Sequence, residues 1–216
     1  MGSYDGRPYD AIILAGGNAR RFGGIDKLRL RIDGRTLLDR AIFAVSGART
    51  IVVVGPMRPI TDQLGVPAIR WTREQPPGTG PLAGIAAGLT LCDAPTVVVL
   101  AGDMPLVTAE VVSQLVASCQ TSDHGAAVLT DASGRPQPLA GAYDTDVLGQ
   151  ALKNIGDLRN RPARLLLDLT EPTSVPDPWA ATDCDTPDEF AVLNRRLSST
   201  PAHSESSPES PETTGR

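Results

Sequence analysis

The sequence is poor in histidine, the side chain that most often serves as a general acid or base near neutral pH. It has only two, and one of them, His203, lies in a polar C-terminal segment. The other, His124, stands between Asp123 and Gly125, a setting typical of a solvated turn. A mechanism that depends on a histidine base or a catalytic triad is therefore not expected.

Cysteine is nearly as scarce. The three cysteines, Cys92, Cys119 and Cys184, are odd in number and widely spaced. This pattern predicts neither a disulfide framework nor a C-x-x-C metal site, and it is typical of a protein in a reducing cytoplasm.

Long apolar runs and an excess of positive charge are also missing. No stretch approaches the roughly 18 apolar residues that a transmembrane helix requires, and the first ten residues contain no apolar signal-peptide core. The formal net charge of −5 disfavours nonspecific binding to nucleic acid. We expect a soluble protein whose partners include neither a membrane nor a nucleic acid.

A length of 216 residues fits one domain. From Ser198 to Arg216 the only aliphatic residue is Ala202, among Ser, Pro, Glu and Thr. Such a composition cannot offset the entropy of ordering and predicts disorder. The expected division is an extension over residues 1–8, a domain over 9–197 and a disordered tail over 198–216.

Short apolar runs rich in Ile and Val predict buried strands over Ala11–Ala15, Ile51–Gly55 and Thr96–Ala101. Apolar residues at helical spacing predict helices over Thr36–Ser46 and Thr108–Ser118. Alternating strands and helices indicate an α/β fold with a mostly parallel central sheet flanked by helices. Ligands of such folds bind at the carboxyl ends of the strands.

A second strand region follows these elements. Ala126–Thr130 and Pro138–Tyr143 read as strands on either side of the turn Asp131–Gly134. We expect a hairpin or an extension of the sheet there, which could face a second substrate.

The segment Ile12–Lys27, IILAGGNARRFGGIDK, runs an apolar strand into a glycine-rich loop with two arginines and a lysine. Glycines allow backbone N–H groups to approach an anion closely, and a lysine ammonium is a common phosphate partner. Lys27 is one of only two lysines beside eighteen arginines. The segment matches neither the P-loop nor the G-x-G-x-x-G pattern. It predicts a nucleotide phosphate site, the alternative being a solvated turn.

Asp103 follows the apolar run VVVLAG and is expected at the carboxyl end of a buried strand. Mg²⁺ binds one or two carboxylates and takes waters and substrate phosphates as its other ligands, so this placement suits the metal. The alternative is an aspartate that caps the turn before Pro105.

Four motifs resemble, in the same order, those of nucleotidyltransferases related to molybdenum cofactor guanylyltransferase. The first is Leu14-Ala15-Gly16-Gly17 with Arg21, Gly23 and Lys27, in which Ala19 stands where many members have Ser. The others are Gly80-Pro81-Leu82-Ala83-Gly84, Gly102-Asp103-Met104-Pro105 and Asp183-Cys184-Asp185-Thr186-Pro187-Asp188-Glu189. The resemblance extends over about residues 9–197.

The resemblance implies a single-domain, Rossmann-like nucleotide-diphospho-sugar transferase fold. It further implies transfer of GMP from GTP to molybdopterin with Mg²⁺, giving molybdopterin guanine dinucleotide and pyrophosphate, with proteins that insert and deliver the cofactor as possible partners. The catalytic residues would be Arg21, Lys27 and Asp103, and Asp103 would also hold the metal. The nucleotide would be bound by Leu14, Ala15, Gly16, Gly17, Arg21, Lys27, Glu74, Gly80, Pro81, Leu82, Gly84 and Asp103.

Glu74 carries the expectation of guanine specificity. In the family an acidic residue upstream of the second motif accepts hydrogen bonds from the guanine N1–H and amino group, and a carboxylate matches that pair of donors. Arg73 beside it leaves the alignment open by one residue. The alternative is an exposed loop glutamate.

The acceptor site is less clearly indicated. Its candidates are Gln137, Arg164, Asp183 and Asp185, although cations and amides in an arginine-rich chain also occur on solvated faces. The two aspartates could instead belong to the start of the last helix, which Pro187 and the acids after it predict.

Two other functions remain open. One is a related enzyme, either a cytidylyltransferase for the same cofactor or a nucleotidyltransferase acting on a sugar phosphate or phospholactate. The first motif favours guanine, because cytosine enzymes more often carry a second Ala there. The other is a nucleotide-binding protein without turnover, against which the intact Arg21, Lys27 and Asp103 argue.

Overall fold

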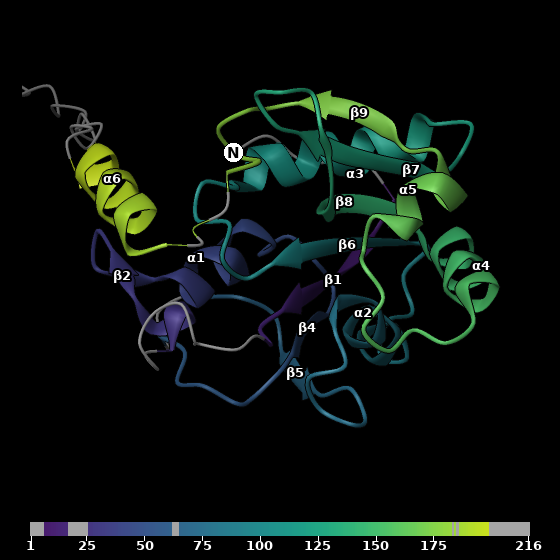
Figure 1. The fold of residues 1–216 in the computed structure, drawn as a ribbon, viewed down its shortest axis with the longest axis horizontal. Coiled ribbons are helices and arrows are strands. Elements are labelled where there is room, and N and C mark those ends of the chain that lie inside the picture. The colour runs from purple at the N-terminus through teal and green to yellow at the C-terminus, as the bar shows by residue number, and fades with distance from the viewer. Residues whose placement is uncertain (1–6, 17–25, 62–64, 183, 185, 199–216) are drawn as a thin grey trace, which may run out of the picture.

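A seven-stranded sheet organises the computed structural model, which describes residues 7–16, 26–61, 65–182, 184 and 186–198 (Figure 1). The strand order is β5-β4-β1-β6-β8-β7-β9, and β8 alone runs antiparallel to its neighbours. The strands are β1 (Tyr9–Leu14), β4 (Ile51–Val54), β5 (Ile69–Thr72), β6 (Thr96–Ala101), β7 (Ala126–Thr130), β8 (Pro136–Asp144) and β9 (Thr173–Pro176). A separate two-stranded pair is formed by β2 (Arg31–Ile32) and β3 (Arg35–Thr36).

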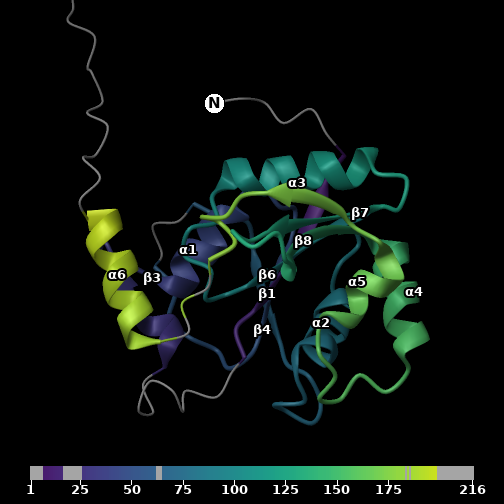
Figure 2. The same cartoon turned by 45° about the horizontal axis from the view of Figure 1, so that its top comes forward.

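The helices cover both faces of this sheet (Figure 2). They are α1 (Leu37–Ala44), α2 (Pro81–Leu89), α3 (Ala109–Thr121), α4 (Thr145–Ile155), α5 (Leu165–Thr170) and α6 (Pro187–Ser198), with a 3-10 helix over Lys27–Arg29. The core has two parts, one between the sheet and α1 and α3, the other between the sheet and α2, α4 and α5. Within the described part of the chain, no helix combines the length and the apolar character needed to cross a membrane.

β1 is central to both cores because side chains alternate across a strand. Ala11 and Ile13 pack in the core of α1 and α3, whereas Ile12 packs in the core of α2 and α4. Both faces of β1 are therefore buried, which explains the apolar run Ala11–Leu14.

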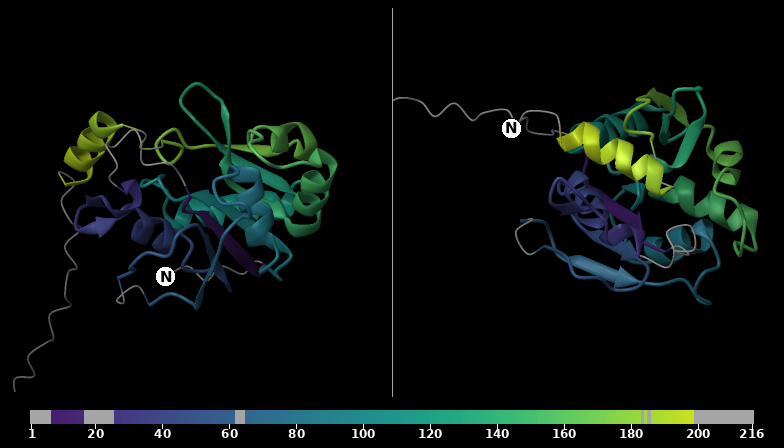
Figure 3. Two further views of the ribbon diagram at one scale, coloured as in Figure 1. Left: turned by 60° about the horizontal axis from the view of Figure 1, so that its bottom comes forward. Right: turned by 60° about the vertical axis from the view of Figure 1, so that its left-hand side comes forward.

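Leu14, near the end of β1, pairs with Val54 of β4 and Ala101 of β6. The residues that follow these three parallel strands therefore meet at one edge of the sheet. We call this edge the carboxyl edge. β7 runs in the same direction, so the turn between β7 and β8 also lies there, and Figure 3 shows the loop projecting from the body.

The expected α/β architecture is confirmed, as are the strands and helices predicted around it. Thr36 and Thr108 cap α1 and α3, and β7 and β8 form the expected hairpin. The edge strands β5 and β9 and the β2–β3 pair were not predicted. Helix α6 is the predicted last helix and includes Ser198, one residue past the expected boundary, while residues 199–216 lie outside the described part of the chain.

Candidate nucleotide site

The predicted phosphate and metal residues meet at the carboxyl edge. The Nζ atom of Lys27 donates to Oδ2 of Asp103 at 2.8 Å, and the two side chains are 15% and 28% exposed. The pair joins the residue that begins the 3-10 helix after β1 to the second residue after β6. Its partly exposed position leaves it open to a ligand from solvent.

Close packing of two neighbouring strands brings this pair together. The N–H of Gly102 donates to the carbonyl of Leu14 at 3.0 Å. A Cβ atom on Gly102 would lie 3.2 Å from that carbonyl oxygen and from Cδ1 of Leu28. A glycine before Asp103 therefore lets the end of β6 lie directly on the end of β1, and the expected placement of Asp103 at a strand end is confirmed.

The first motif is only partly described. Ala15 is fully buried just after the end of β1. Gly16 is exposed, and a Cβ atom there would meet no atom of the described residues within 4 Å. Gly17, Arg21 and Gly23 lie outside the described residues.

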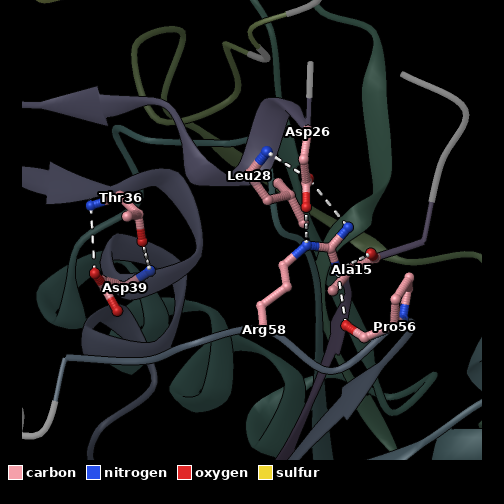
Figure 4. Close-up of polar contacts among 7 residues, drawn as sticks. All are labelled: Ala15, Asp26, Leu28, Thr36, Asp39, Pro56 and Arg58. Atoms are coloured by element: carbon pink, nitrogen blue, oxygen red, sulfur yellow. Dashed lines mark hydrogen bonds and ion pairs between the residues drawn. The ribbon is translucent and has the colours of Figure 1, made fainter. Parts of the chain in front are cut away.

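Arg58, which the sequence analysis did not single out, connects the two ends of this motif (Figure 4). Its guanidinium donates to both carboxylate oxygens of Asp26 at 2.6 and 3.1 Å. It also donates to the carbonyls of Ala15 at 2.7 Å and of Pro56 at 3.1 Å. The feature of the sequence that could have drawn attention to Arg58 is the Gly55-Pro56 turn, which leads from β4 to it.

The loop of Glu74 leads into α2. Glu74 is buried, and its Oε1 atom accepts the N–H of Gly78 at 2.7 Å. Gly80, with φ of 96°, precedes Pro81 at the first position of the helix. Glu74 is therefore not the exposed glutamate of the alternative reading; one of its oxygens holds the turn before α2.

Helix α2 approaches the sheet closely through glycine. A Cβ atom on Gly84 would lie 3.1 Å from Cδ2 of Leu14, and one on Gly88 would lie 2.8 Å from Cγ2 of Ile12. Leu82 is fully buried and packs in the core between α2 and the sheet. The packing places the start of α2 next to the end of β1.

Two predicted acceptor residues lie on other elements, one on β8 and one at the start of α5. Gln137, near the start of β8, donates its amide to Asp131 of the hairpin turn at 3.2 Å. Arg164 is exposed at the start of α5, in a connection whose Asn160 N–H donates to the carbonyl of Thr79 at 2.6 Å.

The carboxylate of Asp131, in the hairpin turn, is held in its charged form by its hydrogen bonds. The Ser133 hydroxyl and the backbone N–H of Arg135 hold the pKa of Asp131 well below its usual range. The Asp131 carboxylate is therefore charged throughout the neutral range.

The last motif also reaches Asp103. The N–H of the buried Cys184 donates to the carbonyl of Asp103 at 3.1 Å. Asp183 and Asp185, the predicted acceptor residues, flank it in the sequence and lie outside the described residues.

The donor chemistry of the pair fits Mg²⁺. Asp103 presents a hard, partly exposed oxygen donor, which suits a metal that takes its other ligands from phosphate and water. No group of three or more His, Cys, Asp or Glu side chains lies in metal-binding proximity among the described residues.

Two of the described thiols, those of Cys92 and Cys119, do not offer a nucleophile. Burial raises the pKa of Cys92 to about 12 and that of Cys119 to about 12, so both thiols stay protonated at neutral pH.

Comparison with known proteins identifies the family of this chain. Residues 11–175 match the family described as the MobA-like NTP transferase domain. A probable molybdenum cofactor guanylyltransferase from Chloroflexus aggregans is 31% identical over 207 residues, covering 88% of this chain and 95% of the relative.

Two solved structures share the fold at lower identity. A 2-C-methyl-D-erythritol 4-phosphate cytidylyltransferase from Thermus thermophilus has a TM-score of 0.66 at 22% identity, covering 88% of this chain and 99% of the other. Molybdopterin-guanine dinucleotide biosynthesis protein A from Archaeoglobus fulgidus has a TM-score of 0.62 at 22% identity, covering 88% and 98%.

Proposed function

This chain belongs to the family of MobA-like NTP transferase domains, and we propose that it transfers GMP from GTP to molybdopterin. The products are molybdopterin guanine dinucleotide and pyrophosphate. The observation that carries the proposal is the pairing of Lys27 with Asp103 at 2.8 Å, at the ends of adjacent parallel strands.

Lys27 and Arg21 hold the triphosphate in this proposal, together with the backbone of Gly16 and Gly17. The ammonium of Lys27 has three donors, so it can contact phosphate oxygens while it remains near Asp103. Positive charge at this point offsets the charge that develops on pyrophosphate as the bond to the α-phosphorus breaks.

Asp103 is the residue that would hold Mg²⁺, and the bound metal would neutralise phosphate charge and orient the triphosphate. Lys27 keeps the Asp103 carboxylate in place through its hydrogen bond. The N–H of Cys184 fixes the backbone of Asp103 from the other side.

Glu74 is the proposed guanine contact. Its Oε1 atom accepts from Gly78, which orients the carboxylate at the start of α2. A carboxyl oxygen has a second lone pair, and the side chain has a second oxygen, so hydrogen bonds to N1–H and the amino group remain feasible.

The acceptor phosphate needs no histidine to become a nucleophile. A phosphate monoester has a second pKa of about 6 and is largely dianionic at neutral pH. An oxygen of the acceptor phosphate forms a bond to the α-phosphorus of GTP while the bond from that phosphorus to the β-phosphate oxygen breaks. The chain contributes mainly position and charge, with Gln137, Arg164, Asp183 and Asp185 as proposed contacts of the acceptor.

Pyrophosphate release provides the test. The purified chain is incubated with Mg²⁺, molybdopterin and each of GTP, CTP, ATP and UTP, and the dinucleotide product is identified by mass spectrometry. We expect pyrophosphate only with GTP and only when molybdopterin is present. Release with CTP alone would contradict the guanine assignment, and no release with any nucleotide would contradict the proposed transfer.

A further inference from the structure

Arg58 lies in the segment between β4 and β5, at the carboxyl edge, and its guanidinium contacts both a carboxylate and the backbone there. Its Nε and Nη2 atoms donate to the two oxygens of Asp26 at 2.6 and 3.1 Å. Its Nη1 atom donates to Ala15 and Pro56. The side chain of Arg58 is 10% exposed and that of its partner Asp26 is 35% exposed, so the pair is partly shielded from water.

The arrangement depends on the shape of guanidinium. Four N–H groups of one planar group are directed to a carboxylate on one side and to two carbonyls on the other. A lysine ammonium carries the same charge, but its three donors leave from one nitrogen and cannot reproduce this fork. The contacts therefore select arginine specifically.

The backbone approach that allows these contacts requires glycine before Pro56. Gly55 has a φ of +150°, and a Cβ atom there would lie 2.6 Å from both the carbonyl carbon and the carbonyl oxygen of Ala15. The end of β4 thus lies directly against the residue after β1. Arg58, three residues later, can then reach the Ala15 carbonyl.

Ala15 and Asp26 stand at the two ends of the glycine-rich motif. Asp26 also caps the 3-10 helix that begins at Lys27, because its Oδ1 atom accepts the N–H of Leu28 at 3.3 Å. By holding Asp26, Arg58 fixes the start of that helix. Because Lys27 is the first residue of that helix, its backbone is fixed as well.

We propose that Arg58 is a positioning residue for the nucleotide site. It ties Asp26 to the end of β1 and thereby holds Lys27 where it meets both Asp103 and the triphosphate. This inference rests on the proposed function only for the role of Lys27 in triphosphate binding.

The test compares Arg58→Lys with the unchanged protein by calorimetric titration with GTP and Mg²⁺. We expect Kd for GTP to rise about tenfold, as the loss of oriented charge-assisted hydrogen bonds would cause. In steady-state assays KM for GTP should rise while KM for molybdopterin stays the same.

A double-mutant cycle separates positioning from a general loss of structure. If Arg58 acts through Lys27, then Arg58→Lys should have no further effect on Kd in a Lys27→Ala background. Equal loss in both backgrounds would overturn the proposal, and so would an unchanged Kd for Arg58→Lys in the otherwise unchanged chain.

Arg70→Lys is the matched control. Arg70 is exposed on β5 and donates to the carbonyl of Leu91, beyond the C-terminal end of α2 and away from the carboxyl edge. Its replacement should leave Kd within about twofold. A loss equal to that of Arg58→Lys would contradict a role specific to Arg58.

Asp26→Asn provides a second route if Arg58→Lys does not fold. This substitution removes the negative charge that pairs with Arg58 and keeps the size of the side chain. It should weaken GTP binding in the same Lys27-dependent way. Unfolding of both variants, seen as loss of the cooperative melt, would overturn the positioning role. Failure of the unchanged chain to bind any nucleoside triphosphate would instead contradict the proposed function itself.

Discussion

The nucleotide half of the sheet and the acceptor half hold their candidate residues by different means. Around β1, β4 and β6, parallel strands end together and the residues that follow them contact each other directly, as Lys27 and Asp103 do. Beyond β6 the antiparallel strand β8 interrupts the parallel order; Gln137 lies near the start of β8, and Arg164 lies at the start of α5. The residues assigned to the chemistry follow the ends of neighbouring parallel strands, whereas those assigned to the acceptor lie on the hairpin and next to a loop.

Replacing Asp103 by Ala should have the largest effect, because it removes the proposed metal ligand and the partner of Lys27. We expect turnover to fall by at least about a thousandfold. Thermal denaturation should show an intact fold, since Asp103 is partly exposed at the end of a strand. Pyrophosphate release by this variant at the rate of the unchanged chain would contradict the role of Asp103 as the metal ligand.

Lys27→Ala should rank next and act on the nucleotide side alone. Loss of one charge-assisted contact to phosphate is expected to lower kcat/KM for GTP by about a hundredfold. Lys153→Ala is the matched control, because Lys153 is the only other lysine and is exposed near the end of α4. Equal losses in the two variants would contradict the assignment.

A pair of glycine substitutions compares the backbones of the two halves. Gly55→Ala would place Cβ 2.6 Å from the Ala15 carbonyl, and we expect a loss of about 2–4 kcal/mol in the free energy of unfolding. Gly134 in the hairpin has φ of +76° with nothing within 4 Å, so Gly134→Ala should cost about 1 kcal/mol. Denaturant titration measures both, and equal losses would argue against the close packing at β4.

Gln137→Ala tests the acceptor half. The expected result is a rise in KM for molybdopterin of about three- to tenfold, with KM for GTP unchanged, because the side chain lies in the hairpin rather than between β1 and β6. Steady-state kinetics with each substrate varied in turn provides the measurement. A rise confined to KM for GTP would reverse the assignment of the two halves.

Removal of residues 199–216 should have the smallest effect. The segment is rich in Ser, Pro, Glu and Thr and poor in apolar residues. We expect the melting temperature and turnover to match those of the full chain. A large loss of activity would show that the segment contributes to the site.

The central strands could be predicted from the sequence because strands buried on both faces are apolar at nearly every position. β1, β4 and β6 are apolar at nearly every position, and glycines follow all three of them. The edge strands β5 and β9 were missed because partial burial mixes polar and apolar residues, as in Ile69–Thr72 and Thr173–Pro176. Two-residue strands such as β2 and β3 leave no periodicity to read.

Site residues within motifs were predictable, whereas those defined by long-range contacts were not. Lys27 stood out as a rare lysine after a glycine-rich loop. Arg58 is one of eighteen arginines, and its partners Asp26 and Ala15 lie 32 and 43 residues away in the chain. Only the pairing of β1 with β4 brings them together.

The central claim is tested most directly by calorimetric titration of the unchanged chain with GTP, CTP, ATP and UTP in Mg²⁺, without an acceptor. The account predicts that GTP binds selectively under these conditions, because the nucleotide half is complete without molybdopterin. Preference for CTP would contradict the role of Glu74 in base recognition. Binding of no triphosphate would contradict the assignment of Lys27 and Asp103 to a nucleotide site.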